Sequence, residues 1–164
     1  MTIPGADAVM TLGWREWVRL PSLRIPAVRA KMDTGAQSSA LHVVSLHTER
    51  RDGVEWVTFA SDVNPRRPDR VIPAEAQVHD ERLVRTSSGH EELRVVIRTR
   101  LEIGGRAWEI VLTLAQREMM RFRLLIGREA LRGRAVVDVA RSYLAAPPPG
   151  RRTLAPPTGR KEEE

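Results

Sequence analysis

The chain of 164 residues contains no cysteine. Disulfide bonds, thiolate metal sites and a cysteine nucleophile are therefore excluded. No apolar run approaches the roughly 20 residues that a helix needs to span a bilayer. The N-terminal segment also lacks the basic and apolar regions of a signal peptide. We therefore expect a cytoplasmic protein with no membrane segment.

Lysine is also scarce: only Lys31 and Lys161 stand among the 27 basic residues, and the net charge is +6. Arginine makes forked hydrogen bonds to carboxylates and phosphates, so a basic surface favours an anionic partner, either an acidic peptide or nucleic acid. An arginine-rich composition also arises from codon usage alone. The tryptophans lie in apolar runs and not between arginines, which predicts core or interface positions and makes nucleic acid an unlikely partner.

The two ends of the chain differ from its middle. Residues 1–11 are small and polar, and they predict a disordered N-terminal segment. Residues 147–164 are rich in proline and mixed charge, and they predict a disordered tail. The remainder, 12–146, is long enough to form one domain with its own hydrophobic core.

Short apolar and β-branched runs, separated by turn residues, fill this domain. The arginine- and proline-rich stretch 61–73 predicts a loop, and 128–131 predicts one helical turn. Such a pattern is typical of an all-β barrel or sandwich with one short helix. The expected strands cover residues 14–20, 25–32, 40–46, 54–60, 83–86, 93–99, 101–103, 108–114, 124–126 and 135–139.

The tetrapeptide Asp33-Thr34-Gly35-Ala36 directly follows one of these strands. Asp33 could cap a short helix that begins at Thr34, which is a common use of aspartate. Alternatively, Gly35 could allow a sharp turn that presents Asp33 at the end of the strand as a catalytic carboxylate. The local sequence favours neither interpretation.

A second motif, Leu124-Leu125-Ile126-Gly127-Arg128, decides between them. Together the two motifs resemble the retropepsins, in which Asp-Thr-Gly-Ala comes early and apolar-apolar-Gly-Arg comes late. The chain is most similar to a bacterial retropepsin-like family whose members carry the name ATP-dependent zinc protease. Genome context links that family to an ATP-grasp ligase that adds glutamates to a ribosomal protein. The matching blocks are 31–42, 84–94, 101–105, 124–139 and 142–144.

The resemblance implies a closed β-barrel protomer of the acid-protease fold. It makes Asp33 the catalytic carboxylate, Thr34 the residue that locks two active-site loops together, and Gly35 a position of close approach. Structural support would come from the residues around the two motifs, and a hairpin tip would form a flap over the cleft. The supporting residues are Ala36, Gly127 and Arg128, and the flap residues are Ser87, Ser88, Gly89 and His90.

One aspartate supplies only one of the two carboxylates that such a site needs. Peptide hydrolysis of this kind needs one carboxylate to take a proton from water and a second, protonated one to give a proton to the carbonyl oxygen. The chain holds a single Asp-Thr-Gly, so the second carboxylate must be Asp33 of another copy. We therefore expect a homodimer with two-fold symmetry, and activity that depends on it.

The chain departs from the retropepsin pattern at Gln37, where an acidic residue often pairs with the arginine of the Gly-Arg motif. We therefore expect Arg128 to bond a backbone carbonyl or Asp138 instead.

The zinc and ATP of the family name have no support in the residues. The chain has no His-Glu-x-x-His and no phosphate-binding Gly-x-x-x-x-Gly-Lys loop. His42 and His47 lie five positions apart, which on one strand places them on opposite faces. The run His79-Asp80-Glu81 could supply metal ligands, but so could any surface cluster. We therefore expect no metal and no cofactor, and assign any ATP dependence to the partner ligase.

The leading hypothesis is an aspartic endopeptidase, a hydrolase acting on a peptide or protein such as a glutamate-modified ribosomal protein. The alternative is a non-catalytic dimeric binding module that partners the ATP-grasp ligase, because a fold does not fix an activity.

Overall fold

The computed structural model describes residues 8–64, 66–67, 69–85, 88–117 and 119–145. Within them the chain is almost entirely β-structure, with one 3-10 turn, η1 (Pro21–Leu23), and one short helix, α1 (Arg128–Leu131). None of the described helices is long and apolar enough to cross a membrane. The strands are β1 (Met10–Gly13), β2 (Arg15–Leu20), β3 (Ile25–Asp33), β4 (Ser39–His42), β5 (Ser45–Arg51), β6 (Val54–Ser61), β7 (Ile72–Gln77), β8 (Asp80–Arg85), β9 (Glu91–Ile103), β10 (Arg106–Ala115), β11 (Leu124–Gly127) and β12 (Ala135–Asp138).

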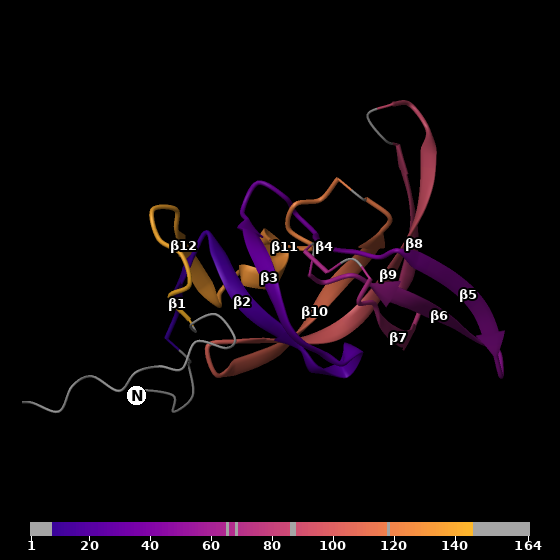
Figure 1. The fold of residues 1–164 in the computed structure, drawn as a ribbon, viewed down its shortest axis with the longest axis horizontal. Helices are drawn as coiled ribbons and strands as arrows, with labels where there is room; N and C mark the ends of the chain where they lie inside the picture. Colours follow the sequence, from indigo (N-terminus) through magenta and orange to yellow (C-terminus); the bar gives the residue numbers. More distant parts are fainter. Residues whose placement is uncertain (1–7, 65, 68, 86–87, 118, 146–164) are drawn as a thin grey trace, which may run out of the picture.

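Six strands close into a barrel, which confirms the predicted fold class. The order is β10-β4-β11-β3-β2-β9, and β9 pairs with β10 to complete the ring (Figure 1). The 13-residue strand β9 runs the whole length of the barrel and continues beyond it as one arm of a hairpin with β8. Alternate side chains of these strands point inward and form the core. Fully buried members include Val28, Leu41, Ile97, Leu112 and Leu124.

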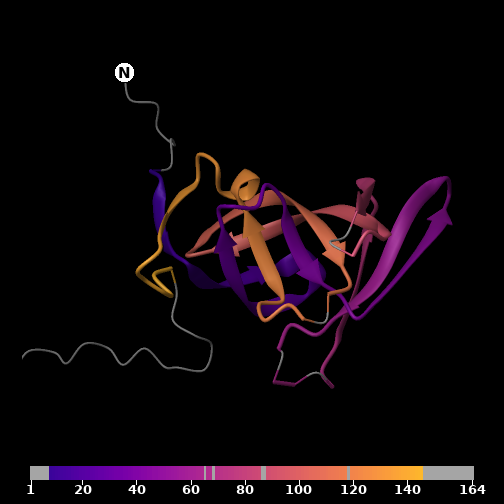
Figure 2. The same cartoon turned by 90° about the horizontal axis from the view of Figure 1, so that it is seen from above.

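A second sheet of three antiparallel strands, β5-β6-β7, extends away from the barrel (Figures 1 and 2). The single strand expected over 40–46 is wrong, because the chain leaves the barrel after His42 and begins β5 at Ser45. At this crossing Val43 N–H donates to the Ala115 carbonyl of the barrel. The next residue, Val44, donates to the Ala60 carbonyl of the outer sheet. The change of partner divides one apolar run between two sheets.

The outer sheet also corrects the loop expected over 61–73, because β7 begins at Ile72 within it. Pro73 lies inside this strand. A proline has no N–H to donate, and β7 tolerates it because it is the edge strand of its sheet.

The described ends of the chain meet in a two-stranded parallel sheet. Here β1 pairs with β12, with Met10 opposite Ala135 and Gly13 opposite Asp138. Met10 and Thr11, expected in the disordered segment 1–11, therefore belong to a strand. Its partner lies more than 120 residues away, and local composition carries no sign of it. Residues 1–7 and the tail expected at 147–164 lie outside the described residues.

Candidate active site

Asp33 is the last residue of β3, and Thr34 and Gly35 form a turn directly after it. The turn is closed by Ala36 N–H, which donates to the Asp33 carbonyl at 3.2 Å. No helix begins at Thr34, so the interpretation of Asp33 as a helix cap is wrong. The side chain of Asp33 is half-buried, whereas Thr34 and Gly35 are exposed.

The second motif lies against the first. Strand β11 runs parallel to β3, with Ile126 opposite Met32 and Gly127 opposite Asp33. Two segments that are about ninety positions apart in the sequence are thus hydrogen-bonded neighbours, and both end at the same edge of the barrel.

Gly127 has no room for a side chain. A Cβ at this position would lie 2.5 Å from the Ser38 carbonyl oxygen and 2.8 Å from that of Gln37. The amide of Gly127 donates to Ser39 Oγ at 3.0 Å, and Ser39 is buried. The loop that follows Asp33 therefore packs its own backbone onto Gly127. Sequence reasoning missed Ser39, because a serine beside a turn carries no local sign of this distant partner.

Arg128 holds the same loop through its main chain and its side chain. Its N–H donates to the Ala36 carbonyl at 2.8 Å, and its Nη1 donates to the Gly35 carbonyl at 3.2 Å. Of the two partners expected for Arg128, the structure shows the backbone carbonyl. Gln37 instead donates from Nε2 to Glu129 Oε1 at 2.7 Å, a neutral–charged pair between the same loop and helix α1.

Within one chain, neither the backbone conformation nor the packing of Gly35 calls for a glycine. Its φ lies outside the left-handed region that favours glycine. A Cβ there would lie 3.5 Å from Asp33 Oδ1, which is an ordinary contact. The turn of a single protomer therefore does not require glycine at this position.

The residues expected to form the flap lie at the tip of the hairpin of β8 and β9. Its tip includes Ser88, Gly89 and His90, all exposed, while Ser87 lies outside the described residues. Gly89 has a φ of 84°, a conformation that favours glycine. Figure 1 shows the hairpin projecting from the barrel on the same side as the turn that follows β3. The cross-strand pair Leu83 and Leu93 remains largely exposed on it.

A buried polar network, also missed by sequence reasoning, anchors the segment between β10 and β11. Arg117 N–H donates to His42 Nδ1 at 2.9 Å, so the imidazole proton is on Nε2, which faces Asp62 Oδ1 at 3.4 Å. Asp62 Oδ2 lies 3.2 Å from Arg123 Nη2. His42 therefore has partners on both ring nitrogens, which gives it a structural role. His42 lies on β4 and His47 on β5, in different sheets, so the two side chains do not share one strand.

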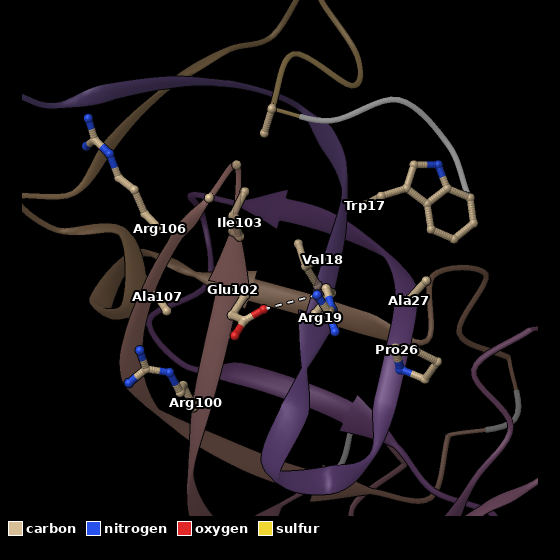
Figure 3. A pocket seen from close by; sticks show the side chains of 13 residues that line it. Trp17, Val18, Arg19, Pro26, Ala27, Arg100, Glu102, Ile103, Arg106 and Ala107 are labelled. Carbon is tan, nitrogen blue, oxygen red and sulfur yellow. Dashed lines mark ion pairs between the residues drawn. The ribbon is translucent and has the colours of Figure 1, made fainter. Parts of the chain in front are cut away.

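Potential metal ligands do not gather elsewhere in the described part of the chain. No group of three or more histidine, aspartate or glutamate side chains there could hold a metal ion. A pocket of about 590 Å³ lies between β2, β3 and the β9–β10 turn, with Trp17, Arg19, Glu102 and Arg106 among its lining residues (Figure 3). An ion pair of 3.6 Å joins Arg19 to Glu102 across it. This pocket does not include Asp33, which lies next to an exposed turn.

A closed barrel with a strand-end Asp-Thr-Gly turn, supported by Gly-Arg from a parallel strand, defines the retropepsin-like class of proteins. Within that class the chain belongs to the RimB-like family. Residues 11–148 match its family model, which is described as retropepsin-like aspartic endopeptidase RimB.

Curated relatives are longer than this chain. A Desulfotalea psychrophila protein named "Probable alpha-L-glutamate ligase" is 45% identical over 131 residues, which are 79% of this chain and 28% of the relative. A protein of the same name from Parasynechococcus marenigrum is 42% identical over 134 residues, which are 80% of this chain and 28% of the relative. The chain thus spans less than a third of the length of the curated relatives it matches.

The fold has a solved counterpart in Lpg0085 from Legionella pneumophila, described as a protein of unknown function. Its crystal structure superposes with a TM-score of 0.70 at 22% identity, covering 84% of this chain and 99% of that one. At this identity the likeness supports the barrel fold alone.

Proposed function

We propose that this protein is an aspartic endopeptidase whose active site forms when two copies bring their Asp33 carboxylates together. One observation carries the proposal. Asp33 is held at a strand end by the Gly127–Arg128 segment, yet among the described residues its carboxylate has no hydrogen-bond or ion-pair partner. Structural aspartates are usually paired, so a fixed and unpaired carboxylate is suited to chemistry.

The reaction needs two such groups. The ionised carboxylate takes a proton from water as the water oxygen attacks the peptide carbonyl carbon. The protonated carboxylate donates its proton to the carbonyl oxygen. Two carboxylates in contact resist double ionisation, so the pair holds one proton between them near the working pH. The carboxylate that took the water proton then gives it to the amide nitrogen as the carbon–nitrogen bond breaks, and one hydroxyl of the tetrahedral intermediate returns its proton to the other carboxylate.

Several features of the protomer support a homodimer. Thr34 and Gly35 are exposed, although Gly127 and Arg128 of the same protomer hold the rest of the motif in place. Among the described residues the β1–β12 sheet has two strands, and exposed apolar side chains lie on or next to it: Val9, Val136 and Val139. Such a small apolar sheet gains stability when strands or side chains of another copy cover it.

The expected substrate is an acidic segment of a protein, such as a glutamate-modified ribosomal protein. The net charge of +6 favours approach of an acidic chain. The curated relatives carry the name of an alpha-L-glutamate ligase, and the joining of glutamates creates an acidic segment.

The test is cleavage of a glutamate-extended peptide by the wild type and by Asp33→Asn, which keeps the shape and removes the titrating group. Asp69→Asn, on an exposed loop, is the matched control. We expect cleavage to be lost only in Asp33→Asn, and the active species to sediment as a dimer. Equal cleavage by all three proteins would rule out a catalytic Asp33.

A second candidate is a non-catalytic dimeric module that binds and regulates an ATP-grasp ligase. It is favoured by the size of the relatives, since the matched region is 28% to 30% of chains that are named as ligases. This candidate predicts that a ligase binds Asp33→Ala as tightly as the wild type and that neither protein cleaves the peptide.

A further inference from the structure

Arg94 lies on β9 at the base of the flap hairpin, and its guanidinium is largely enclosed without being satisfied. The side chain is 14% exposed. Its Nε and Nη2 atoms are buried and have no hydrogen-bond partner. The nearest carboxylate oxygen, Glu92 Oε2, is 3.9 Å from Nη2, which is too long for a hydrogen bond. Leaving charged donors unpaired costs more than leaving a neutral group unpaired, so a fold keeps such an arrangement for a reason.

Apart from Glu92, the charged groups placed beside Arg94 carry the same sign as its own. Arg82 stands directly opposite it in the β8–β9 ladder, and directly opposite residues share one face of a sheet. The guanidinium of Arg82 pairs with Asp80 at 3.2 Å, which leaves that carboxylate already engaged. Like charges in this position destabilise a hairpin unless an anion joins them.

A third arginine approaches from the neighbouring strand. Val95 pairs with Leu114, which places Arg94 beside the end of β10, two residues before Arg117. Burial lowers the pKa of Arg94, and the positive charge of Arg117 lowers it further. An anion between the two guanidinium groups would oppose both effects, because its negative charge favours the charged form of Arg94.

A groove beside Arg117, the exposed member of this pair, has room for a peptide. Arg117 lines a pocket of about 590 Å³ together with Val43, Val44, Met119 and Met120. Val44 and Met119 are 42% and 96% exposed, so the groove is apolar as well as open. An extended chain could place apolar atoms against the methionines and a side-chain carboxylate against the arginines.

We infer that Arg94 and Arg117 form a binding site for the carboxylates of an acidic peptide. Guanidinium groups match a carboxylate in geometry, with two parallel N–H donors for two oxygens. Arg94 would offer its unused Nε and Nη2 donors once its buried guanidinium turns toward the groove, and Arg117 would close on the ligand from the exposed side. This inference rests on the proposed function for the identity of the peptide. The binding itself needs no chemistry at Asp33.

The experiment measures binding by the full chain carrying Asp33→Asn, so that the probe is not cut. The probe is a fluorescein-labelled hexaglutamate, followed by anisotropy, with hexaglutamine as the neutral comparison. Arg94→Gln and Arg117→Gln are compared with Arg98→Gln, a matched control on the same strand whose exposed side chain faces Glu109 at 3.8 Å. We expect each of the first two changes to weaken hexaglutamate binding by about tenfold, the size of one lost charged hydrogen bond. The control should bind like the parent.

Hexaglutamate binding that is equal in all of these proteins would overturn the site, as would tighter binding of an RNA oligonucleotide at Arg94 and Arg117. If Arg94→Gln does not fold, Arg117→Gln decides, because that side chain is exposed. The two proposals fail differently. If Asp33 is not catalytic, cleavage is absent while arginine-dependent binding persists. If the arginine site is wrong, cleavage continues with an unchanged kcat/KM in both arginine variants.

Discussion

Gly127 stands directly opposite Asp33 on a parallel strand, and its missing side chain is filled by the backbone of Gln37 and Ser38. The backbone of the candidate catalytic loop is therefore packed directly against the backbone of the second motif. The donors of Arg128 then fix the Gly35 and Ala36 carbonyls of the same loop. Position and orientation of the carboxylate thus depend on residues that never touch it.

Gly127→Ala should destabilise the protein by about 1–3 kcal/mol, the usual cost of overpacking a closely packed site. The new methyl group would meet two backbone carbonyls, which cannot move aside as a flexible side chain could. Urea unfolding of the variant and the wild type measures the difference. An unchanged unfolding midpoint would mean that the loop is loosely held and that its packing on Gly127 does not fix its position.

Ser39→Ala should also destabilise, by about 1–3 kcal/mol, because it leaves the buried Gly127 N–H without its acceptor. Ser22→Ala is the matched control, since Ser22 is exposed. Urea unfolding should separate the two variants clearly. We also expect Ser39→Ala to lower peptide cleavage more than its stability loss explains, because the loop after Asp33 loses one of its anchors. Identical midpoints for the two variants would contradict this account.

The barrel and the Asp33 loop were predictable because their signals are local or come as motifs. Apolar alternation located most strands, and the family resemblance carried by two short motifs put Gly127 and Arg128 in support of Asp33. Several of the corrections involve distant partners. His42 ends β4 because the next two amides bond to different sheets, and Met10 is in a strand because β12 lies beside it. Ser39 and Arg94 acquire their importance from neighbours that no local pattern shows.

Glu81 should make stability fall as the pH rises. A hydrogen bond with Glu55 raises the pKa of Glu81 above its usual value, and burial and nearby carboxylates raise it further. The folded state therefore binds this proton more tightly than the unfolded state. The resulting stability is full below the unfolded pKa and is lost as the pH rises through the folded pKa.

We therefore expect Glu81→Gln to flatten this part of the Tm–pH curve, and to raise Tm relative to the wild type at neutral pH. Glu91→Gln, at an exposed end of β9, should leave the slope as it is. Thermal melts from about pH 4 to about pH 7.5 supply the comparison, because this range begins near the ordinary pKa of a glutamate and extends well above it. A wild-type slope retained in Glu81→Gln would place the titrating group elsewhere.

Gly35→Ala distinguishes what the fold of one protomer requires at this position from what the active dimer requires. Within one chain the added Cβ meets only Asp33 Oδ1, at 3.5 Å, and the backbone there is not left-handed. The free energy of unfolding of the protomer should therefore change by less than about 1 kcal/mol. If a second copy or a substrate approaches this exposed turn closely, the same methyl group should reduce cleavage by about tenfold or more. This is the size of effect expected when a small steric clash displaces reacting groups. Sedimentation at several concentrations then shows whether the loss follows a weaker dimer or a blocked cleft. A variant that dimerises and cleaves like the wild type would show that neither approaches Gly35, and the two-fold arrangement of Asp33 would have to be abandoned.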